Sequence, residues 1–299
     1  MPLTIKQLKV KYGKQTALEI CGPISFEKGD RIGIIGSNGA GKTTLVKAIL
    51  GLVDYEGRIV TQLTPEQMAA HMQFNEYAVT MPVKYIMETI LNTKIRENKK
   101  LQELISFFDF EGCLSKKFSS LSGGQKQRFT IIMVMLQNAE LTFYDEVTSG
   151  LDFETRQKLM EKLVEWYQGK DNTLLVVSHY YEELEQLADK ILILDQGKVI
   201  AYGKKEQLFQ TFCGNAVFIL ENEKRNRELA EKFTKLKSPD HLIAISCRNR
   251  EEEEKILSLL VSHDVNFKRS NCDIEIMYAN AKERFYEQKG EKENEGKKM

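Results

Sequence analysis

The sequence predicts an α/β fold with a mainly parallel sheet. Continuous apolar runs bounded by turn residues recur at residues 31–35, 141–144, 173–177 and 190–194. Runs without polar alternation are typical of parallel strands that are covered on both faces. Between these runs the apolar residues follow helical spacing, and Leu159, Leu163 and Trp166 predict a covering helix over residues 154–168. These patterns indicate a layered α/β domain over residues 1–212.

Two parts of this domain depart from the parallel pattern. We expect an antiparallel β portion at the N-terminus, before the first continuous apolar run. Strand signals then lapse between about residues 80 and 138, where residues 82–92 and 99–110 have helical patterns. The sequence therefore predicts a helical subdomain inserted into the α/β core.

Strand and helix patterns start again after Gly214. We expect strands at residues 216–220, 242–247 and 272–277, and helices at residues 226–236 and 250–263. This pattern predicts a small α+β accessory domain over residues 213–281. Residues 282–299 mix charges of both signs with almost no apolar side chains, which is typical of a frayed helix or a disordered end.

Composition narrows the class of protein. Lys+Arg and Asp+Glu both number 43, so there is no bulk positive charge, and we expect no nucleic-acid partner. Five cysteines lie far apart without a CxxC pair, as in reduced cytosolic proteins rather than zinc sites or disulfide frameworks. No run of about 18 uncharged apolar residues occurs, so in any membrane process a partner must cross the bilayer.

The sharpest local signal is a glycine-rich segment between the strand at 31–35 and an apolar helical run at 45–50. It reads Gly36-Ser37-Asn38-Gly39-Ala40-Gly41-Lys42-Thr43, which is the G-x-x-x-x-G-K-[ST] pattern of a P-loop. Glycines let backbone N–H groups face phosphate oxygens, and the helix N-terminus adds its positive end. We expect Lys42 to reach the β- and γ-phosphates of a nucleotide, Thr43 to ligate Mg²⁺, and Thr44 to belong to the same site.

Two carboxylates follow the apolar strand at 141–144. In this position Asp145 can hold Mg²⁺ through water, and Glu146 can act as the general base toward an attacking water. In isolation, two acids after a strand are more often an ordinary solvated strand end. Their interpretation therefore depends on the P-loop and on the next motif.

The segment Leu121-Ser122-Gly123-Gly124-Gln125 precedes an apolar helical run at residues 129–136. This LSGGQ segment resembles the signature motif of the ATP-binding-cassette (ABC) family, and the resemblance covers about residues 3–212. In that family the signature loop closes on the γ-phosphate of ATP held by the P-loop of a second subunit. The resemblance therefore implies that Ser122, Gly123, Gly124 and Gln125 contact nucleotide across a dimer interface, through backbone amides and a helix dipole.

Four further residues match family positions in the same order along the chain. Gln73 matches the Q-loop glutamine, which senses Mg²⁺ and the γ-phosphate, and Asp152 matches the D-loop residue at the dimer interface. His179 matches the switch histidine that contacts the γ-phosphate, and Tyr12 matches the aromatic residue that stacks on adenine. Alone, each has an ordinary structural role, and Tyr12 could be a packed strand residue.

The sequence also departs from the family pattern. Val147 stands where the family usually has proline, the segment 138–140 lacks a common proline, and Thr142 and Tyr144 interrupt a normally aliphatic strand. These departures bear on the placement of Glu146 and the D-loop.

In the family, a groove beside the Q-loop receives a helix of the membrane subunit. Residues 75–87 are the candidates here, with Tyr77, Met81, Val83 and Tyr85 either forming this docking surface or belonging to the core of the helical subdomain. Both alternatives remain open at the level of sequence.

The resemblance implies an enzyme that binds ATP and Mg²⁺ and hydrolyses ATP. Its expected partners are a second ATPase subunit, in a homodimer closed by nucleotide, and a separate integral-membrane permease. The expected location is cytoplasmic, at the inner face of the cell membrane. The resemblance is to the stand-alone ATPases of prokaryotic drug, peptide and lipid exporters, so the expected direction of transport is export. The alternative is a soluble ABC ATPase in a non-transport role such as iron–sulfur cluster assembly, whereas a purely regulatory module would require a lost catalytic residue.

Overall fold

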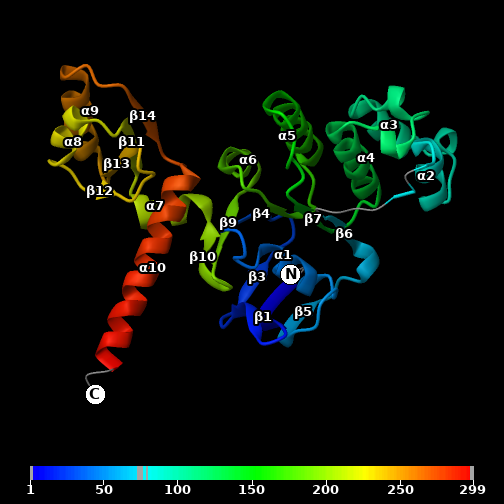
Figure 1. The fold of residues 1–299 in the computed structure, drawn as a ribbon, viewed down its shortest axis with the longest axis horizontal. Helices are drawn as coiled ribbons and strands as arrows, with labels where there is room; N and C mark the ends of the chain where they lie inside the picture. Colours follow the sequence, from blue (N-terminus) through cyan, green and yellow to red (C-terminus); the bar gives the residue numbers. More distant parts are fainter. Residues whose placement is uncertain (1–2, 73–76, 79, 297–299) are drawn as a thin grey trace. The chain divides into compact units, whose positions relative to one another are not determined.

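The computed structural model describes residues 3–72, 77, 78 and 80–296 (Figure 1). These residues form two compact units. The first comprises the chain up to Val10, Cys21–Ile32 and Thr43–Ser178; the second comprises Lys11–Ile20, Gly33–Lys42 and the chain from His179 onward. The chain passes between the units within β1 (Leu3–Tyr12) and β4 (Arg31–Ile35), and at the start of α1 (Lys42–Ile49).

Parallel strands form the buried part of the first unit. They are β6 (Met68–His71), β7 (Leu141–Asp145) and β8 (Thr173–Val177). Strand β7 pairs in parallel with both of the others, so that Leu141 is opposite Met68 on one side and Thr173 on the other. All residues of β7 and β8 are buried, as expected for parallel strands that are covered on both faces, and neither strand shows the polar alternation of a half-buried strand.

The expected antiparallel N-terminal portion is present in the first unit. Strand β1 pairs in antiparallel fashion with β3 (Ile24–Phe26) and β5 (Glu56–Thr61). Leu3 is opposite Phe26 in one pair and Thr61 in the other. Alternating burial along β1 indicates one covered face, as the period of a half-buried strand requires.

Helices make up most of the rest of the first unit. Besides α1, which lies in this unit from Thr43 onward, the α-helices are α2 (Val83–Ile90), α3 (Lys99–Phe107), α4 (Gly123–Leu136) and α5 (Phe153–Tyr167). Short 3-10 helices are η1 (Pro65–Gln67), η2 (Ile95–Glu97), η3 (Glu111–Cys113) and η4 (Phe118–Ser120). The predicted helices at 82–92, 99–110 and 154–168 are confirmed within a few residues.

The second unit begins with a mixed sheet. Its strands are β2 (Gln15–Ile20), β9 (Lys190–Asp195), β10 (Lys198–Lys204) and the part of β4 from Gly33 onward. Strands β9 and β10 form an antiparallel hairpin in which Lys198 is opposite Asp195. The turn is tight because Gln196 and Gly197 have φ values of 47° and 73°, a geometry that favours glycine.

Beyond this sheet the second unit contains a separate four-stranded antiparallel sheet. Its elements in chain order are β11 (Ala216–Glu221), α8 (Lys224–Ala230), β12 (Lys235–Leu236), β13 (Leu242–Cys247), α9 (Arg250–Ser262) and β14 (Phe267–Ser270). The strand order β12-β13-β11-β14 with antiparallel neighbours is that of a ferredoxin-like βαββαβ arrangement. Its core is apolar and includes Phe218, Ile245, Ile256 and Leu260.

Two expected elements in this region are wrong. The predicted helix at 226–236 ends at Ala230, and the chain then pairs as β12 with β13. The predicted strand at 272–277 is not a strand: the last strand is β14, and α10 (Ile274–Gly296) follows. The apolar residues Ile274, Ile276 and Met277 are buried in the first turn of that helix.

Helix α10 packs against α6 (Tyr181–Leu187), α7 (Lys205–Cys213) and β10 within the second unit. It runs across the predicted boundary between residues 281 and 282, so the charged segment begins inside a helix. The domain limits drawn from sequence stay predictions. Within the described residues, no helix is both long enough and apolar enough to span a bilayer.

Candidate functional site

The glycine-rich loop lies between β4 and α1, as the sequence predicts. A Cβ atom on Gly36 would lie 2.2 Å from the Leu194 carbonyl oxygen, and one on Gly41 would lie 3.0 Å from the Ala17 carbonyl oxygen. Gly41 also has a φ of 102°, which L side chains rarely adopt. Glycine is therefore required here so that the loop can pack directly on neighbouring backbone.

Lys42 is buried at the end of this loop. Its Nζ donates hydrogen bonds to the carbonyl oxygens of Gly36, at 2.7 Å, and Ser37, at 3.2 Å. The ammonium group thus lies within the curve of the loop, where a bound phosphate would be expected. A buried ammonium group attracts phosphate strongly because little water screens it.

The β9–β10 hairpin is hydrogen-bonded to the glycine-rich loop at two points. Gly197 N donates to Ala40 O at 3.2 Å, and Ser37 Oγ donates to Asp195 Oδ1 at 2.8 Å. Sequence reasoning missed Asp195. The run Asp195-Gln196-Gly197 after an apolar strand signals a tight turn, but nothing local indicates which loop that turn contacts.

Thr43 and Asp145 lie together in the first unit. Thr43 Oγ1 donates to Asp145 Oδ2 at 2.9 Å, although the two residues are 102 positions apart in the chain. Asp145 is the buried last residue of β7, and Thr43 belongs to the first turn of α1. The predicted pair of magnesium ligands is therefore brought into contact.

Glu146 follows Asp145 with an unusual backbone. Its φ is 52°, in the left-handed region, and its N–H donates to Val177 O at 2.9 Å. Val147, which replaces the usual proline, is buried. A residue with a Cβ atom seldom adopts the left-handed region, so the backbone at Glu146 is strained.

The signature segment forms the N-terminus of α4. Ser122 Oγ accepts from Gln125 N at 3.3 Å and Gln125 Oε1 accepts from Ser122 N at 3.1 Å, which is a capping box. A Cβ on Gly124 would lie 2.9 Å from Thr155 Cγ2 of α5, so glycine permits close packing there. Ser122 is exposed at the helix start, where N–H groups point outward.

A buried histidine connects α4 to the sheet. His71 ends β6 opposite Tyr144, and its Nε2 lies 2.8 Å from Gln127 Oε1 of α4. Burial lowers the pKa of His71, and the bond to Gln127 only partly opposes this effect, so the ring is favoured in its neutral form. The signature helix is thus anchored beside the strand that carries Asp145.

The remaining predicted residues have varied positions. Asp152 is exposed and caps α5, since its Oδ1 accepts from Thr155 N at 3.0 Å; this hydrogen bond lowers the pKa of Asp152. His179 is exposed and comes two residues after β8, and Tyr12 is half exposed at the end of β1. Gln73 lies outside the described residues.

The candidate docking residues divide between the two alternatives given by the sequence, an exposed docking surface and the core of the helical subdomain. Tyr77 contacts the rings of Phe118 and Phe129, and Val83 is fully buried, so these two belong to the core of the helical region. Met81 and Tyr85 are exposed at 39% and 51%, so these two are available to a partner.

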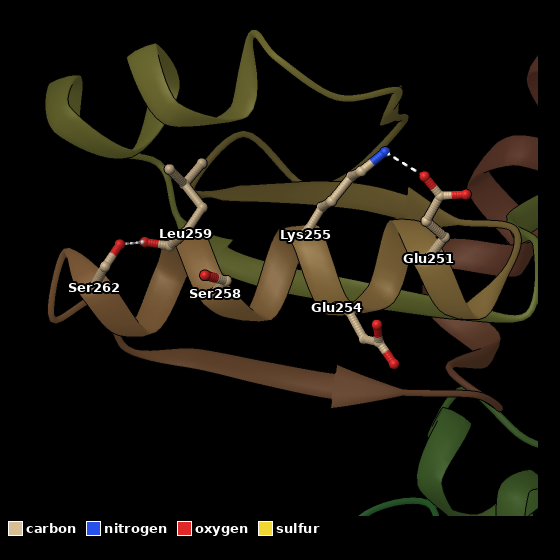
Figure 2. Close-up of a pocket in the computed structure, with 6 residues that line it drawn as sticks. All are labelled: Glu251, Glu254, Lys255, Ser258, Leu259 and Ser262. Atoms are coloured by element: carbon tan, nitrogen blue, oxygen red, sulfur yellow. Dashed lines mark hydrogen bonds and ion pairs between the residues drawn. The ribbon is translucent and has the colours of Figure 1, made fainter.

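A separate surface hollow lies along α9 and contains none of the predicted site residues (Figure 2). In it, Lys255 Nζ is ion-paired with Glu251 Oε1 at 2.7 Å, one turn away on the same helix. Pairs of this kind stabilise an exposed helix slightly and indicate no chemistry.

The residues near the P-loop fit a magnesium nucleotide. A threonine hydroxyl and an aspartate carboxylate offer the oxygen ligands that Mg²⁺ prefers, and Mg²⁺ usually completes its shell with phosphate oxygens and water. No cluster of three or more His, Cys, Asp or Glu side chains with metal-binding geometry occurs among the described residues.

Comparisons with known proteins agree with these features. A model of the ABC transporter family matches residues 23–149. The methionine import ATP-binding protein MetN of Bartonella henselae is 26% identical over 284 residues, 87% of this chain and 82% of that protein. The linearmycin resistance ATP-binding protein LnrL of Bacillus subtilis is 28% identical over 235 residues, 73% of this chain and 74% of that protein.

A solved structure of the ATP-binding subunit of an ABC transporter is similar with a TM-score of 0.63. The two chains are 25% identical, and the similarity covers 71% of this chain and 93% of the other. The predicted α/β fold and the predicted family are confirmed. Residues 23–149 carry the domain of the ABC transporter family, and the chain resembles the ATP-binding, ATP-hydrolysing subunits of these transporters in sequence and fold.

Proposed function

We propose that this chain binds ATP with Mg²⁺ at the P-loop and uses its hydrolysis to drive a separate membrane-spanning subunit. The observation that carries the nucleotide site is the hydrogen bond between Thr43 and Asp145, which joins the P-loop helix to the end of β7. In this site Lys42 binds the β- and γ-phosphates, and residues 36–41 surround them with backbone N–H groups. Thr44 and Tyr12 complete the contacts, Tyr12 by stacking on the adenine ring.

Magnesium, when bound, neutralises charge on the β- and γ-phosphates and orients them. Thr43 and Asp145 would hold it, together with Gln73 by analogy with the family. A hydroxyl and a carboxylate that already touch each other need little reorganisation to face the same ion.

Glu146 is proposed as the general base. It accepts a proton from a water molecule whose oxygen attacks the γ-phosphorus, while the bond from that phosphorus to the bridging oxygen breaks and ADP leaves. Its left-handed backbone holds the side chain at the end of β7, next to Asp145. His179 is proposed to contact the γ-phosphate, so that the loss of this group is sensed in the segment after β8.

Two copies of the chain are proposed to close around two nucleotides. Ser122, Gly123, Gly124 and Gln125 at the start of α4 are proposed to contact the γ-phosphate held by the other copy. The capping box uses the backbone N–H groups of Ser122 and Gln125, so those of Gly123 and Gly124 are the ones offered to the phosphate, together with the positive end of the helix. Asp152 lies on the same proposed interface. Because the phosphate bridges both copies, hydrolysis removes the bridge and reopens the dimer.

The membrane partner is proposed to dock beside the exposed Met81 and Tyr85. Flexible methionine and amphipathic tyrosine side chains suit an adaptable contact surface. The chain would then act at the inner face of the membrane, without crossing it.

Export as the direction of transport has no support from the comparisons. The name of one relative states import of methionine and the name of another states resistance to linearmycin. We therefore extend the proposal to transport without assigning its direction.

Glu146→Gln tests the catalytic part of this proposal. The variant is expected to bind ATP with wild-type affinity and to accumulate as an ATP-bound dimer, while turnover falls by about 10²–10⁴-fold because the base is lost. Equilibrium binding of a fluorescent ATP analogue, size-exclusion chromatography and phosphate release measure these three properties. Unchanged phosphate release would show that Glu146 is not the base.

Lys42→Ala tests the P-loop, and purification from gently solubilised membranes tests the partner. The Lys42 variant should lose most ATP affinity because the buried ammonium group is removed. The tagged wild-type chain should copurify with an integral-membrane protein. Recovery with iron–sulfur assembly factors and no membrane protein would favour the non-transport alternative.

A further inference from the structure

The C-terminal helix contacts the strand that supports the P-loop. Lys282 Nζ of α10 lies 3.1 Å from Asp195 Oδ1, and Tyr286 OH donates to Asp195 Oδ2 at 2.8 Å. Lys282 and Tyr286 are four residues apart and therefore lie on one face of α10. The Asp195 side chain is only 1% exposed, so α10 covers the carboxylate at the end of β9.

The same carboxylate also holds the P-loop. Asp195 Oδ1 accepts from Ser37 Oγ at 2.8 Å as well as from Lys282 Nζ. Burial alone would raise the pKa of Asp195, but the bonds from Tyr286, Ser37 and Lys282 outweigh it and lower the pKa. Asp195 is therefore ionised at neutral pH, and its bonds are of the stronger, charge-assisted kind.

Tyr286 stays a donor in this arrangement. Burial, followed by the hydrogen bond to Asp195 and its charge, raises the pKa of Tyr286 to about 12. The phenol therefore keeps its proton across the physiological range. The hydrogen bond from Tyr286 to Asp195 is therefore kept across this range.

Ser37 occupies a central position in the loop. Its carbonyl oxygen accepts from Ala40 N at 3.0 Å and from Lys42 Nζ at 3.2 Å. A displacement of Ser37 would therefore change both the turn of the loop and the position of the phosphate-binding ammonium group. Gly197 N supports the same loop at Ala40 O, so the β9–β10 hairpin contacts it at two points.

We propose that Lys282 and Tyr286 are positioning residues for the nucleotide site, and that α10, acting through Asp195 and Ser37, sets the affinity of the P-loop for ATP. If Lys282 or Tyr286 is replaced, the buried Asp195 carboxylate loses one of its hydrogen-bond donors. The carboxylate then reorients toward its remaining donors, and this movement displaces Ser37. A change in the C-terminal region that moves α10 alters nucleotide binding by the same path. This inference rests on the proposed role of the P-loop.

The test uses the full-length chain with the single changes Lys282→Met and Tyr286→Phe. Each should raise the dissociation constant for MgATP, and the KM of hydrolysis, by at least about fivefold. Because neither change touches Glu146, kcat should stay within about twofold of wild type. Lys282→Arg keeps the cation and should restore most of the affinity.

Lys289→Met is the matched control. It removes the same charge from an exposed position of α10, seven residues beyond Lys282 and about 10 Å further along the axis. Its ATP affinity should equal that of the wild type. Equal weakening by Lys282→Met and Lys289→Met would reduce the effect to net charge and overturn the proposal.

A double-mutant cycle with Ser37→Ala tests the path itself. If Lys282 acts through Asp195 and Ser37, Lys282→Met should weaken ATP binding much less in the Ser37→Ala background than in the wild type. If the effects of Lys282→Met and Ser37→Ala on the free energy of ATP binding were additive, Lys282 would not act through Ser37. Wild-type affinity in Lys282→Met and Tyr286→Phe, with weak binding in Lys42→Ala, would overturn this inference alone, whereas wild-type affinity in Lys42→Ala would overturn the proposed nucleotide site.

Discussion

The backbone of Glu146 gives a prediction whose sign is unusual: Glu146→Gly should be more stable than Glu146→Ala. Glu146 has a φ of 52°. The left-handed conformation costs an L residue about 1–2 kcal/mol, and alanine would keep this cost. Glycine avoids it but loses about 0.5–1 kcal/mol through the greater freedom of the unfolded chain. The difference should therefore lie between about 0 and 1.5 kcal/mol in favour of glycine, with a central value of about 0.75 kcal/mol.

Urea denaturation of the two variants, followed by circular dichroism, measures this difference. Both lack the glutamate side chain beyond Cβ, so their comparison isolates the backbone. Both should also have lost ATP hydrolysis, since neither carries a base. The matched control is Glu161, an exposed residue inside α5, where Glu161→Gly should instead be less stable than Glu161→Ala by about 1 kcal/mol.

The reasoning would be refuted if glycine and alanine ranked in the same order at both positions. That result would mean that residue 146 adopts an ordinary right-handed or extended backbone. The strain assigned to Glu146 would then not exist, and the placement of this proposed base at the end of β7 would need another explanation.

Three further predictions follow from contacts within the units. Gly36→Ala should abolish most ATP binding in a fluorescence titration, because its Cβ would lie 2.2 Å from Leu194 O. Tyr167→Phe should cost about 1–3 kcal/mol in denaturation, because the buried Tyr144 hydroxyl loses its partner at 2.8 Å; adding Tyr144→Phe should recover much of this loss. Lys282→Met should destabilise the chain at pH 7, because Lys282 then no longer pairs with the ionised Asp195. The pKa of Asp195 lies below its ordinary value, so the destabilisation should shrink only as acid protonates this carboxyl group. The free energy of unfolding of the variant and of the wild type should therefore be compared at pH 7 and below pH 4.

Each of these three has a clear contrary outcome. Normal ATP binding in Gly36→Ala would mean that the loop does not rest on Leu194. If the loss of stability in the double variant Tyr144→Phe/Tyr167→Phe equalled the sum of the losses in the two single variants, the two hydroxyl groups would not be hydrogen-bonded to each other. A destabilisation by Lys282→Met that does not vary with pH would show that Lys282 does not interact with an ionised Asp195.

Much of the fold could be predicted because its signals are local. The strands β4 and β8 are continuous apolar runs whose ends the sequence marks with turn residues, and they were placed at the observed bounds. The P-loop pattern combines glycine, lysine and threonine at fixed spacing, and its geometry depends mainly on these residues. The magnesium pair Thr43 and Asp145 was inferred in the same way, from motifs.

The region after residue 230 was harder to predict because its elements are short or ambiguous. Residues 235 and 236 form a strand only because they pair with β13, and two residues carry no periodic pattern of their own. The apolar residues from Ile274 to Met277 suit either a strand or a buried helix. Packing against α6 and α7 decides for the helix.

The sequence by itself determined the family, the chemistry and most elements of this protein, because motif residues and apolar periodicity act over a few positions along the chain. Only the tertiary structure decided which distant groups meet. Ser37 and Asp195 are 158 residues apart, and Asp195 and Tyr286 a further 91, yet one buried carboxylate joins all three. A charge removed from water must find partners in space, and the positions of those partners are a property of the folded chain.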